Sequence, residues 1–123
     1  MVEVICDTSF LIHLATTRIK NISTLETDIG AIQFVLPDVV MNELENLSKQ
    51  EKKKHDVLAT LDYCKRLKQI SISGKFADKA LIDYVKQHGG FIGTMDKDLK
   101  DNVKKYGGSI ISFSNDRIVL ESQ

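Results

Sequence analysis

The chain has 123 residues, the length of one ordinary domain, which is enough to bury a core without disulfides or structural zinc. Hydrophobic residues make up 42% of it and charged residues 28%, which are globular values, so we predict one folded domain over residues 1–123. The two cysteines are isolated, the amino-terminal run contains acidic residues unlike a signal peptide, and no apolar stretch approaches the length that crosses a bilayer. The composition therefore argues against disulfide scaffolds, zinc fingers and membrane proteins, and we expect a cytoplasmic protein.

The charges are unevenly distributed along the chain, although they sum to zero. Residues 1–48 contain two basic and seven acidic residues, a net charge of −5, whereas residues 49–75 contain eight basic and three acidic residues, a net charge of +5. A basic segment beside an acidic site suits an enzyme that cuts a polyanion, because carboxylates alone repel phosphates. The alternative is the solvated face of a lysine-rich helix. The residues that we expect to contact a polyanion are Lys52, Lys53, Lys54, Lys65 and Arg66.

The first half of the chain shows an alternation of strand and helix patterns. Its predicted elements are a strand at 2–7, a helix that Thr8 or Ser9 caps and that runs to about Ala15, a weaker helix at 22–29, a short strand at 34–36 and a helix that begins at Pro37 and Asp38. Glu43 lies in the last of these helices, three residues after Val40 and four before Leu47. This is the stripe that a helix turns toward its core, so the Glu43 carboxylate should be buried or face a cleft.

The second half continues the alternation. Its predicted elements are a long amphipathic helix at 52–68, a strand at 70–72, a helix through Asp78 that ends near His88, a strand at 91–94, a helix from Asp98 to near Gly107, and strands at 109–113 and 118–120 around a turn at Asn115 and Asp116. Alternating elements predict an α/β fold in which a mostly parallel central sheet lies between helices, in three layers. Right-handed crossovers would bring the strand ends together at one edge.

Four acidic residues occupy places where a carboxylate is hard to explain by structure alone: Asp7, Glu43, Asp78 and Asp96. Asp7 and Asp96 follow apolar runs that are typical of strands, and ligand sites in open α/β sheets lie at such carboxyl ends. Asp78 shares a predicted helix face with Leu81, so it interrupts an apolar face as Glu43 does. Carboxylates that pack together repel each other and take up protons unless a cation keeps them ionised. The pattern therefore predicts a site for Mg²⁺ or Mn²⁺ with oxygen ligands alone.

Four ordered segments carry a more specific signal. They are residues 7–11 (DTSFL), 37–44 (PDVVMNEL), 77–82 (ADKALI) and 94–99 (TMDKDL). With these segments the chain resembles the PIN-domain ribonucleases over nearly its full length. The resemblance implies that the four acids are catalytic and bind the metal, and that Ser9 and Thr94 are supporting hydroxyls. Asp98 either joins the metal set or interacts with the dipole of its helix.

The resemblance also implies an activity and partners. We expect a Mg²⁺- or Mn²⁺-dependent endoribonuclease that hydrolyses single-stranded RNA with an activated water and leaves 5′-phosphate ends. In many toxin members the fourth segment resembles Thr-x-Asn followed by Phe, whereas Asp96 replaces that Asn here. The segment is closer to ribosomal-RNA-processing PIN proteins and their stand-alone prokaryotic relatives. The implied partners are single-stranded RNA such as a ribosomal RNA precursor, a second copy of the chain, and an antitoxin or a ribosome-associated protein.

Other functions stay open at this point. A toxin ribonuclease restrained by an antitoxin is the runner-up. A non-catalytic RNA-binding or protein-docking PIN domain is the alternative of a different class. A metal-free ribonuclease would need a pair of histidines as acid and base, and none of His13, His55 and His88 has a convincing partner in the sequence.

Overall fold

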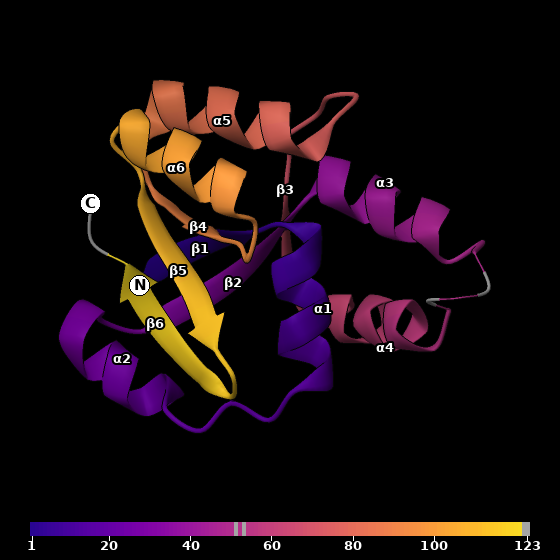
Figure 1. The fold of residues 1–123 in the computed structure, drawn as a ribbon, viewed down its shortest axis with the longest axis horizontal. Coiled ribbons are helices and arrows are strands. Elements are labelled where there is room, and N and C mark those ends of the chain that lie inside the picture. The colour runs from indigo at the N-terminus through magenta and orange to yellow at the C-terminus, as the bar shows by residue number, and fades with distance from the viewer. Residues whose placement is uncertain (51, 53, 122–123) are drawn as a thin grey trace.

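Strands and helices alternate along the chain in the computed structural model, which describes residues 1–50, 52 and 54–121 (Figure 1). The strands are β1 (Val2–Cys6), β2 (Ile32–Pro37), β3 (Lys68–Ile70), β4 (Phe91–Gly93), β5 (Ser109–Ser114) and β6 (Arg117–Glu121). They form one sheet in the order β3-β2-β1-β4-β5-β6, and neighbouring strands are parallel except for the antiparallel pair β5 and β6. The mostly parallel sheet predicted from the sequence is confirmed.

The helices cover both faces of this sheet. They are α1 (Thr8–Thr16), α2 (Ile22–Ile29), α3 (Asp38–Leu47), α4 (Lys54–Cys64), α5 (Ala77–His88) and α6 (Lys97–Lys105). Right-handed crossovers place α1 to α4 on one face and α5 and α6 on the other, because the chain reverses its direction across the sheet after β3. In Figure 1, α5 and α6 lie together at the top, and α1 and α4 pack against each other below them. Within the described residues, no helix is both long and apolar enough to cross a membrane.

The central strands are buried because helices lie on both sides of them. In β1, Val4, Ile5 and Cys6 are buried in succession, the continuous apolar pattern of a parallel strand that is covered on both faces. Phe10 of α1 is fully buried, and its ring stacks on Phe113 of β5 with the two centroids 4.7 Å apart. This packing holds α1 against the sheet directly after β1 ends.

The starts of two helices differ from the predictions. Asp7 caps α1, in place of the predicted Thr8 or Ser9, and Asp96 caps α6, which begins one residue before the predicted Asp98. Each carboxylate accepts a hydrogen bond from the backbone N–H three residues on, at 2.9 Å and 3.1 Å respectively. The first turn of a helix leaves its N–H groups without partners, and an aspartate at the end of the preceding strand satisfies one of them.

The predicted helix at 52–68 is too long, and the predicted strand at 70–72 is displaced. Backbone turns follow the end of α4, and Lys68 already begins β3. β3 ends where its partner β2 reaches Pro37, since the chain turns there into α3 and offers no further strand to pair with. Ile72 remains buried as part of the core although it lies outside the sheet.

A carboxylate ties the last strand to α6. Glu121, at the end of β6, accepts a hydrogen bond from the Ser112 hydroxyl and forms ion pairs with Lys100 (Oε2 to Nζ, 2.7 Å) and Lys104 (Oε1 to Nζ, 3.1 Å). The hydrogen bond from Lys100, and then that from Ser112, lower the pKa of Glu121 from 4.5 to about 2. Because the folded pKa lies below the ordinary value, ionised Glu121 stabilises the fold above pH 4.5, and this contribution disappears as the pH falls toward 2.

We expect Glu121→Gln to lower the free energy of unfolding by about 1–2 kcal/mol near neutral pH, a figure reduced for the solvent screening of a partly exposed side chain. Protonated glutamate and glutamine are both uncharged, so the difference between wild type and variant should shrink below pH 4.5 and vanish near pH 2. Urea denaturation at about pH 7, 4 and 2.5 measures this difference. A difference that stays constant over this range would contradict the ionic role of Glu121.

Candidate functional site

The carboxyl ends of β1 and β4 lie side by side near the middle of the sheet. Cys6 pairs with Gly93 in the parallel register, so Asp7 and Thr94 follow the two strands at equal positions. The chain leaves β1 toward β2 and β3 and returns to β4 on the other side of β1. Such a reversal of strand order separates the helices on the two faces and opens a crevice at the strand ends, where α/β sheets bind their ligands.

Two helices each add an acidic side chain to this crevice. On α3, which packs against α5, Val40 and Leu44 are fully buried, while Glu43 between them is exposed on a neighbouring face. Asp78 lies in the first turn of α5 and is exposed, whereas Leu81 on the same helix is fully buried. Both carboxylates therefore face the crevice rather than the core.

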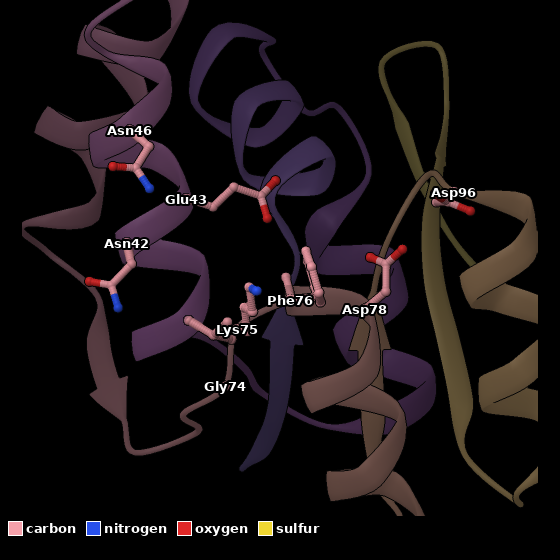
Figure 2. Close-up of a pocket in the computed structure, with 10 residues that line it drawn as sticks. Asn42, Glu43, Asn46, Gly74, Lys75, Phe76, Asp78 and Asp96 are labelled. Carbon is pink, nitrogen blue, oxygen red and sulfur yellow. The ribbon is translucent and has the colours of Figure 1, made fainter.

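Two adjoining cavities occupy the crevice. The smaller, of about 330 Å³, is lined by Asp7, Thr8, Ser9, Glu43, Ala77, Asp78, Met95 and Asp96. The larger, of about 590 Å³, is lined by Val39, Asn42, Glu43, Asn46, Gly74, Lys75, Phe76, Ala77, Asp78 and Asp96 (Figure 2). All four predicted acids thus line the smaller cavity, and Glu43, Asp78 and Asp96 line both. Figure 2 shows the Glu43 carboxylate extending from α3 into the space that separates it from Asp78.

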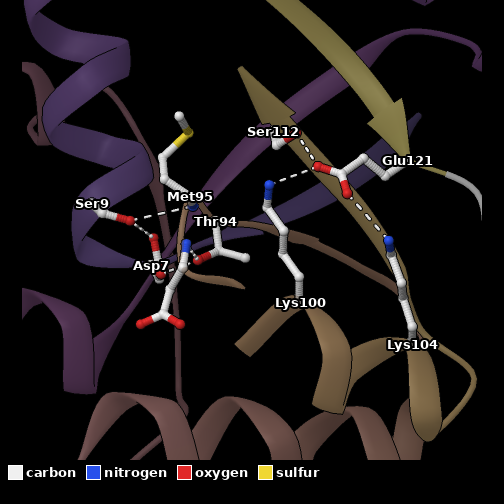
Figure 3. A network of polar contacts seen from close by, with 9 residues as sticks. Asp7, Ser9, Thr94, Met95, Lys100, Lys104, Ser112 and Glu121 are labelled. Atoms are coloured by element: carbon white, nitrogen blue, oxygen red, sulfur yellow. Dashed lines mark hydrogen bonds and ion pairs between the residues drawn. The ribbon is translucent and has the colours of Figure 1, made fainter. Parts of the chain in front are cut away.

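Asp7 is the buried member of the four acids, with an exposed fraction of 5%. Its Oδ1 accepts hydrogen bonds from the Ser9 hydroxyl (3.0 Å) and the Phe10 N–H (2.9 Å), and its Oδ2 accepts one from the Thr94 hydroxyl. Figure 3 shows the bonds from Ser9 and Thr94 to Asp7. The Thr94 oxygen in turn accepts a hydrogen bond from the Asp96 N–H at 3.0 Å. These contacts fix the orientation of the Asp7 carboxylate and join the end of β1 to the loop after β4.

The acids of the site influence one another. Burial raises the pKa of the Asp7 carboxyl; its hydrogen bonds oppose this effect, and the nearby charge of Asp78 adds to it. Burial also raises the pKa of Asp78, and the charges of Asp96 and Asp98 raise it further. A cation bound among these carboxylates would favour the ionised form of each.

The chemistry of the donors fits a hard divalent cation. The four acids and Ser9 present oxygen atoms to the smaller cavity, and oxygen is the ligand that Mg²⁺ and Mn²⁺ prefer. Thr94 is fully buried and lines neither cavity, so it supports Asp7 through its hydrogen bond. Among the described residues, no three His, Cys, Asp or Glu side chains converge into a complete metal-binding group. Mg²⁺ usually keeps several of its waters and binds through one or two carboxylates, so a cavity lined by spaced carboxylates suits a hydrated ion.

Other predicted residues lie outside the two cavities. Asp98 is exposed in the first turn of α6, where its charge interacts favourably with the helix dipole, and it lines neither cavity. The described members of the predicted basic group are exposed and likewise line neither cavity: Lys52, Lys54, Lys65 and Arg66. Lys65 forms an ion pair with Asp62 of α4, with Nζ 3.6 Å from Oδ1. Lys53, which was predicted with them, lies outside the described residues.

The polar and aromatic residues that line the larger cavity and are absent from the predicted site are Asn42, Asn46, Lys75 and Phe76. Asn46 follows Glu43 by three residues, so helical spacing was a sufficient signal to place it on the same wall. Lys75 and Phe76 lie in the connection from β3 to α5, which has no periodic pattern. Their place in the site depends on the path of this connection in three dimensions.

The comparisons with known proteins agree with this architecture. The sequence matches the family described as PIN-like domain over residues 4–115. The chain is similar to the solved PIN domain endonuclease Utp24, with a TM-score of 0.74 and 29% identity over 98% of this chain and 92% of that chain. A domain of a functionally unknown protein from Methanocaldococcus jannaschii DSM 2661 shares the fold, with a TM-score of 0.64 and 14% identity over 100% and 96% of the two chains. No curated protein matches the sequence. The predicted resemblance is thus confirmed, and the chain belongs to the family of PIN-like domains.

Proposed function

We propose that this protein is a metal-dependent endonuclease that hydrolyses phosphodiester bonds of single-stranded RNA. The observation that carries the proposal is that four carboxylates from four segments, Asp7, Glu43, Asp78 and Asp96, line one cavity of about 330 Å³. The similarity to a PIN domain endonuclease supports internal cutting of a nucleic acid. Single-stranded RNA as the substrate follows from the resemblance of the four sequence segments to PIN-domain ribonucleases.

Asp7 is the proposed metal ligand whose carboxylate is held by three hydrogen bonds. Among the described contacts its Oδ1 accepts two hydrogen bonds and its Oδ2 accepts one, so Oδ2 keeps a lone pair for a cation. Ser9 and Thr94 hold this carboxylate in place, as partners of a metal ligand usually do. Glu43, Asp78 and Asp96 would supply the remaining protein oxygens. When bound, Mg²⁺ or Mn²⁺ supplies positive charge that offsets the phosphate and acidifies the attacking water.

The exposed basic residues of the segment around α4 are proposed as outer contacts for the RNA strand. Lys52, Lys54, Lys65 and Arg66 would act through the sequence-independent attraction between cations and phosphates. They lie away from the acidic cavity, so they would hold a strand that extends beyond the cleaved bond rather than the bond itself.

The biological setting is part of the proposal. We place the activity in RNA processing or decay in the cytoplasm, with a ribosomal RNA precursor as one substrate. A toxin ribonuclease held by an antitoxin is the alternative setting, and growth arrest on expression would favour it. A non-catalytic RNA-binding or protein-docking domain is the alternative of a different class, and metal binding without any RNA turnover would favour it.

The chemistry of the product ends tests the proposal. Attack by water should leave a 5′-phosphate on one fragment and a 3′-hydroxyl on the other, because the 3′-oxygen is the leaving group. The measurement is radiolabelling of purified products by polynucleotide kinase, which should require prior removal of the 5′-phosphate by phosphatase. Products with 5′-hydroxyl and 2′,3′-cyclic phosphate ends would instead show attack by the RNA's own 2′-hydroxyl, and the proposed mechanism would be wrong.

A further inference from the structure

Two side chains of the larger cavity, those of Lys75 and Phe76, have no role in the proposed hydrolysis. Lys75 is the one basic side chain among the described residues that line this cavity, beside three acidic ones. Next to it, Phe76 has an exposed fraction of 63%, the largest among the described aromatic side chains. An exposed aromatic ring beside a cation offers a surface on which a flat group can stack.

The connection that carries these two residues is held in place by its neighbours. Ile72 is buried, and its carbonyl accepts a hydrogen bond from a backbone N–H of α3 at 3.0 Å. Gly74 passes so close to α5 that a Cβ at this position would lie 3.1 Å from the Cβ of Ala80. The carbonyl of Phe76 accepts the first hydrogen bond of α5, from the Ala80 N–H at 3.1 Å. The fold therefore fixes the backbone that presents Lys75 and Phe76 to the cavity.

Lys75 and Phe76 line this cavity and also a neighbouring one of about 330 Å³. Figure 2 shows Phe76 between Glu43 on α3 and Asp78 on α5, with the Lys75 side chain beside it. The Lys75 Nζ lies 5.6 Å from the centroid of the Phe76 ring. A flat apolar surface, a single cation and the carboxylates thus lie within one cavity of about 590 Å³.

A nucleotide of a single strand carries the three complementary groups. Its base offers a flat face that can stack on an aromatic ring, its base edge offers donors and acceptors, and its phosphate is anionic. The ring of Phe76 would receive the base, the Lys75 ammonium would contact the phosphate, and the amides of Asn42 and Asn46, which line the α3 wall, would face the base edge. A peptide segment offers no phosphate for Lys75 beside the carboxylates.

We propose that the larger cavity is a nucleotide subsite, in which one base of the bound strand stacks on Phe76 and Lys75 contacts the adjoining phosphate. This inference rests on the proposed function, because it positions the substrate of that reaction. It assigns Phe76 and Lys75 to substrate binding and leaves the cleavage chemistry to the acids of the smaller cavity.

The test is a double-mutant cycle in which the Phe76 ring and one base of the RNA are removed separately and together. Two proteins are compared, Asp7→Asn and the double variant Asp7→Asn/Phe76→Ala, because the Asp7→Asn change should keep the RNA from being cut. Each is titrated, in Mg²⁺, against a fluorescein-labelled single-stranded RNA of about ten nucleotides, and the dissociation constant is measured. An abasic site is moved along the strand one position at a time. At one position we expect the abasic site to weaken binding by about tenfold when Phe76 is present and to have little effect when it is alanine. Phe76→Tyr should preserve the effect, and Phe76→Leu should lose it.

Tyr106 supplies a matched control. It is an exposed aromatic at the far end of α6, with the Nζ atoms of Lys86 and Lys105 4.4 Å and 5.6 Å from its ring centroid, and it lines neither cavity. Tyr106→Ala should therefore leave binding and the abasic effect unchanged. In the otherwise wild-type enzyme, Phe76→Ala should raise KM with little change in kcat, because stacking on a remote base holds the ground state and the transition state equally.

The outcomes separate this inference from the proposed function. Base-dependent coupling to Phe76 without any cleavage by the wild type would support the subsite and overturn the nuclease. Cleavage without coupling at any position would overturn the subsite alone. Equal binding of intact and abasic strands by every variant, or no RNA binding at all, would overturn the subsite and favour a protein segment as the occupant.

Discussion

Asp7→Asn is expected to reduce the rate of RNA cleavage by about 1,000-fold or more, because it removes the negatively charged oxygen that is held in place to bind the cation. A bound cation stabilises the negative charge of the transition state by several kcal/mol. The fold should survive. Asparagine caps a helix as well as aspartate does, and the substitution removes a buried charge whose desolvation raises the pKa of the carboxyl. Cleavage of end-labelled RNA in Mn²⁺ measures the rate, and circular dichroism should show a melting temperature within about 5 °C of the wild type.

Asp28→Asn is the control for this prediction. Asp28 is an exposed aspartate on α2 that lines neither of the two cavities, so its replacement removes the same charge at a distance from the site. Its cleavage rate should equal that of the wild type. If Asp7→Asn lost less than about tenfold, or lost no more than Asp28→Asn, Asp7 would not be a ligand for a catalytic cation.

Phe10→Ala is expected to lower the free energy of unfolding by about 3–5 kcal/mol, a large part of the stability of a domain of this size. Phe10 is fully buried, and its ring centroid lies 4.7 Å from that of Phe113 and 5.8 Å from that of Phe34. The ring also lies against the backbone of β4, since a Cβ on Gly93 would be 2.9 Å from it. Removal of the ring leaves a cavity beneath α1, directly beside the start of the acidic site. Urea denaturation measures the loss.

Phe10→Leu tests whether the loss of stability depends on the volume that is removed from the core. A leucine fills much of the same space, so it should lose less than half as much stability as the alanine variant. Cleavage by Phe10→Ala, measured at a temperature at which it stays folded, should fall as well, because the ring holds α1 and therefore the Asp7 cap against β4. A loss of less than about 1 kcal/mol for the alanine variant would show that the ring does not anchor α1.

The parts of the fold that could be predicted depend on local signals. The helix at 22–29 coincides with α2 because its apolar spacing is complete within the segment. The four acids could be selected because each interrupts or ends an apolar pattern, and a parallel sheet brings such positions to one edge. The position of β3 could not be read in this way. Its start at Lys68 is decided by pairing with β2, about thirty residues earlier in the chain, and neighbouring residues contain no signal for that register.

The finer features of the site depend on contacts between distant segments. An aspartate after a strand suits both a helix cap and a metal ligand, and Asp7 occupies a cap in the structure while it also lines the cavity. The hydrogen bond from Thr94 to Asp7 follows from the pairing of β1 with β4. Lys75 and Phe76 belong to an irregular connection, so no periodic pattern could place them in the cavity.

Metal dependence is measured in a time course of cleavage of end-labelled single-stranded RNA by the wild-type protein. The four conditions are Mn²⁺, Mg²⁺, EDTA, and EDTA followed by excess Mn²⁺. We expect internal cutting in at least one of the two metals, no cutting in EDTA, and recovery of cutting when Mn²⁺ is restored. Asp7→Asn should show no cutting in any of these conditions. Cutting that continues in EDTA, or that Asp7→Asn retains in full, would contradict metal-dependent hydrolysis at the acidic cavity.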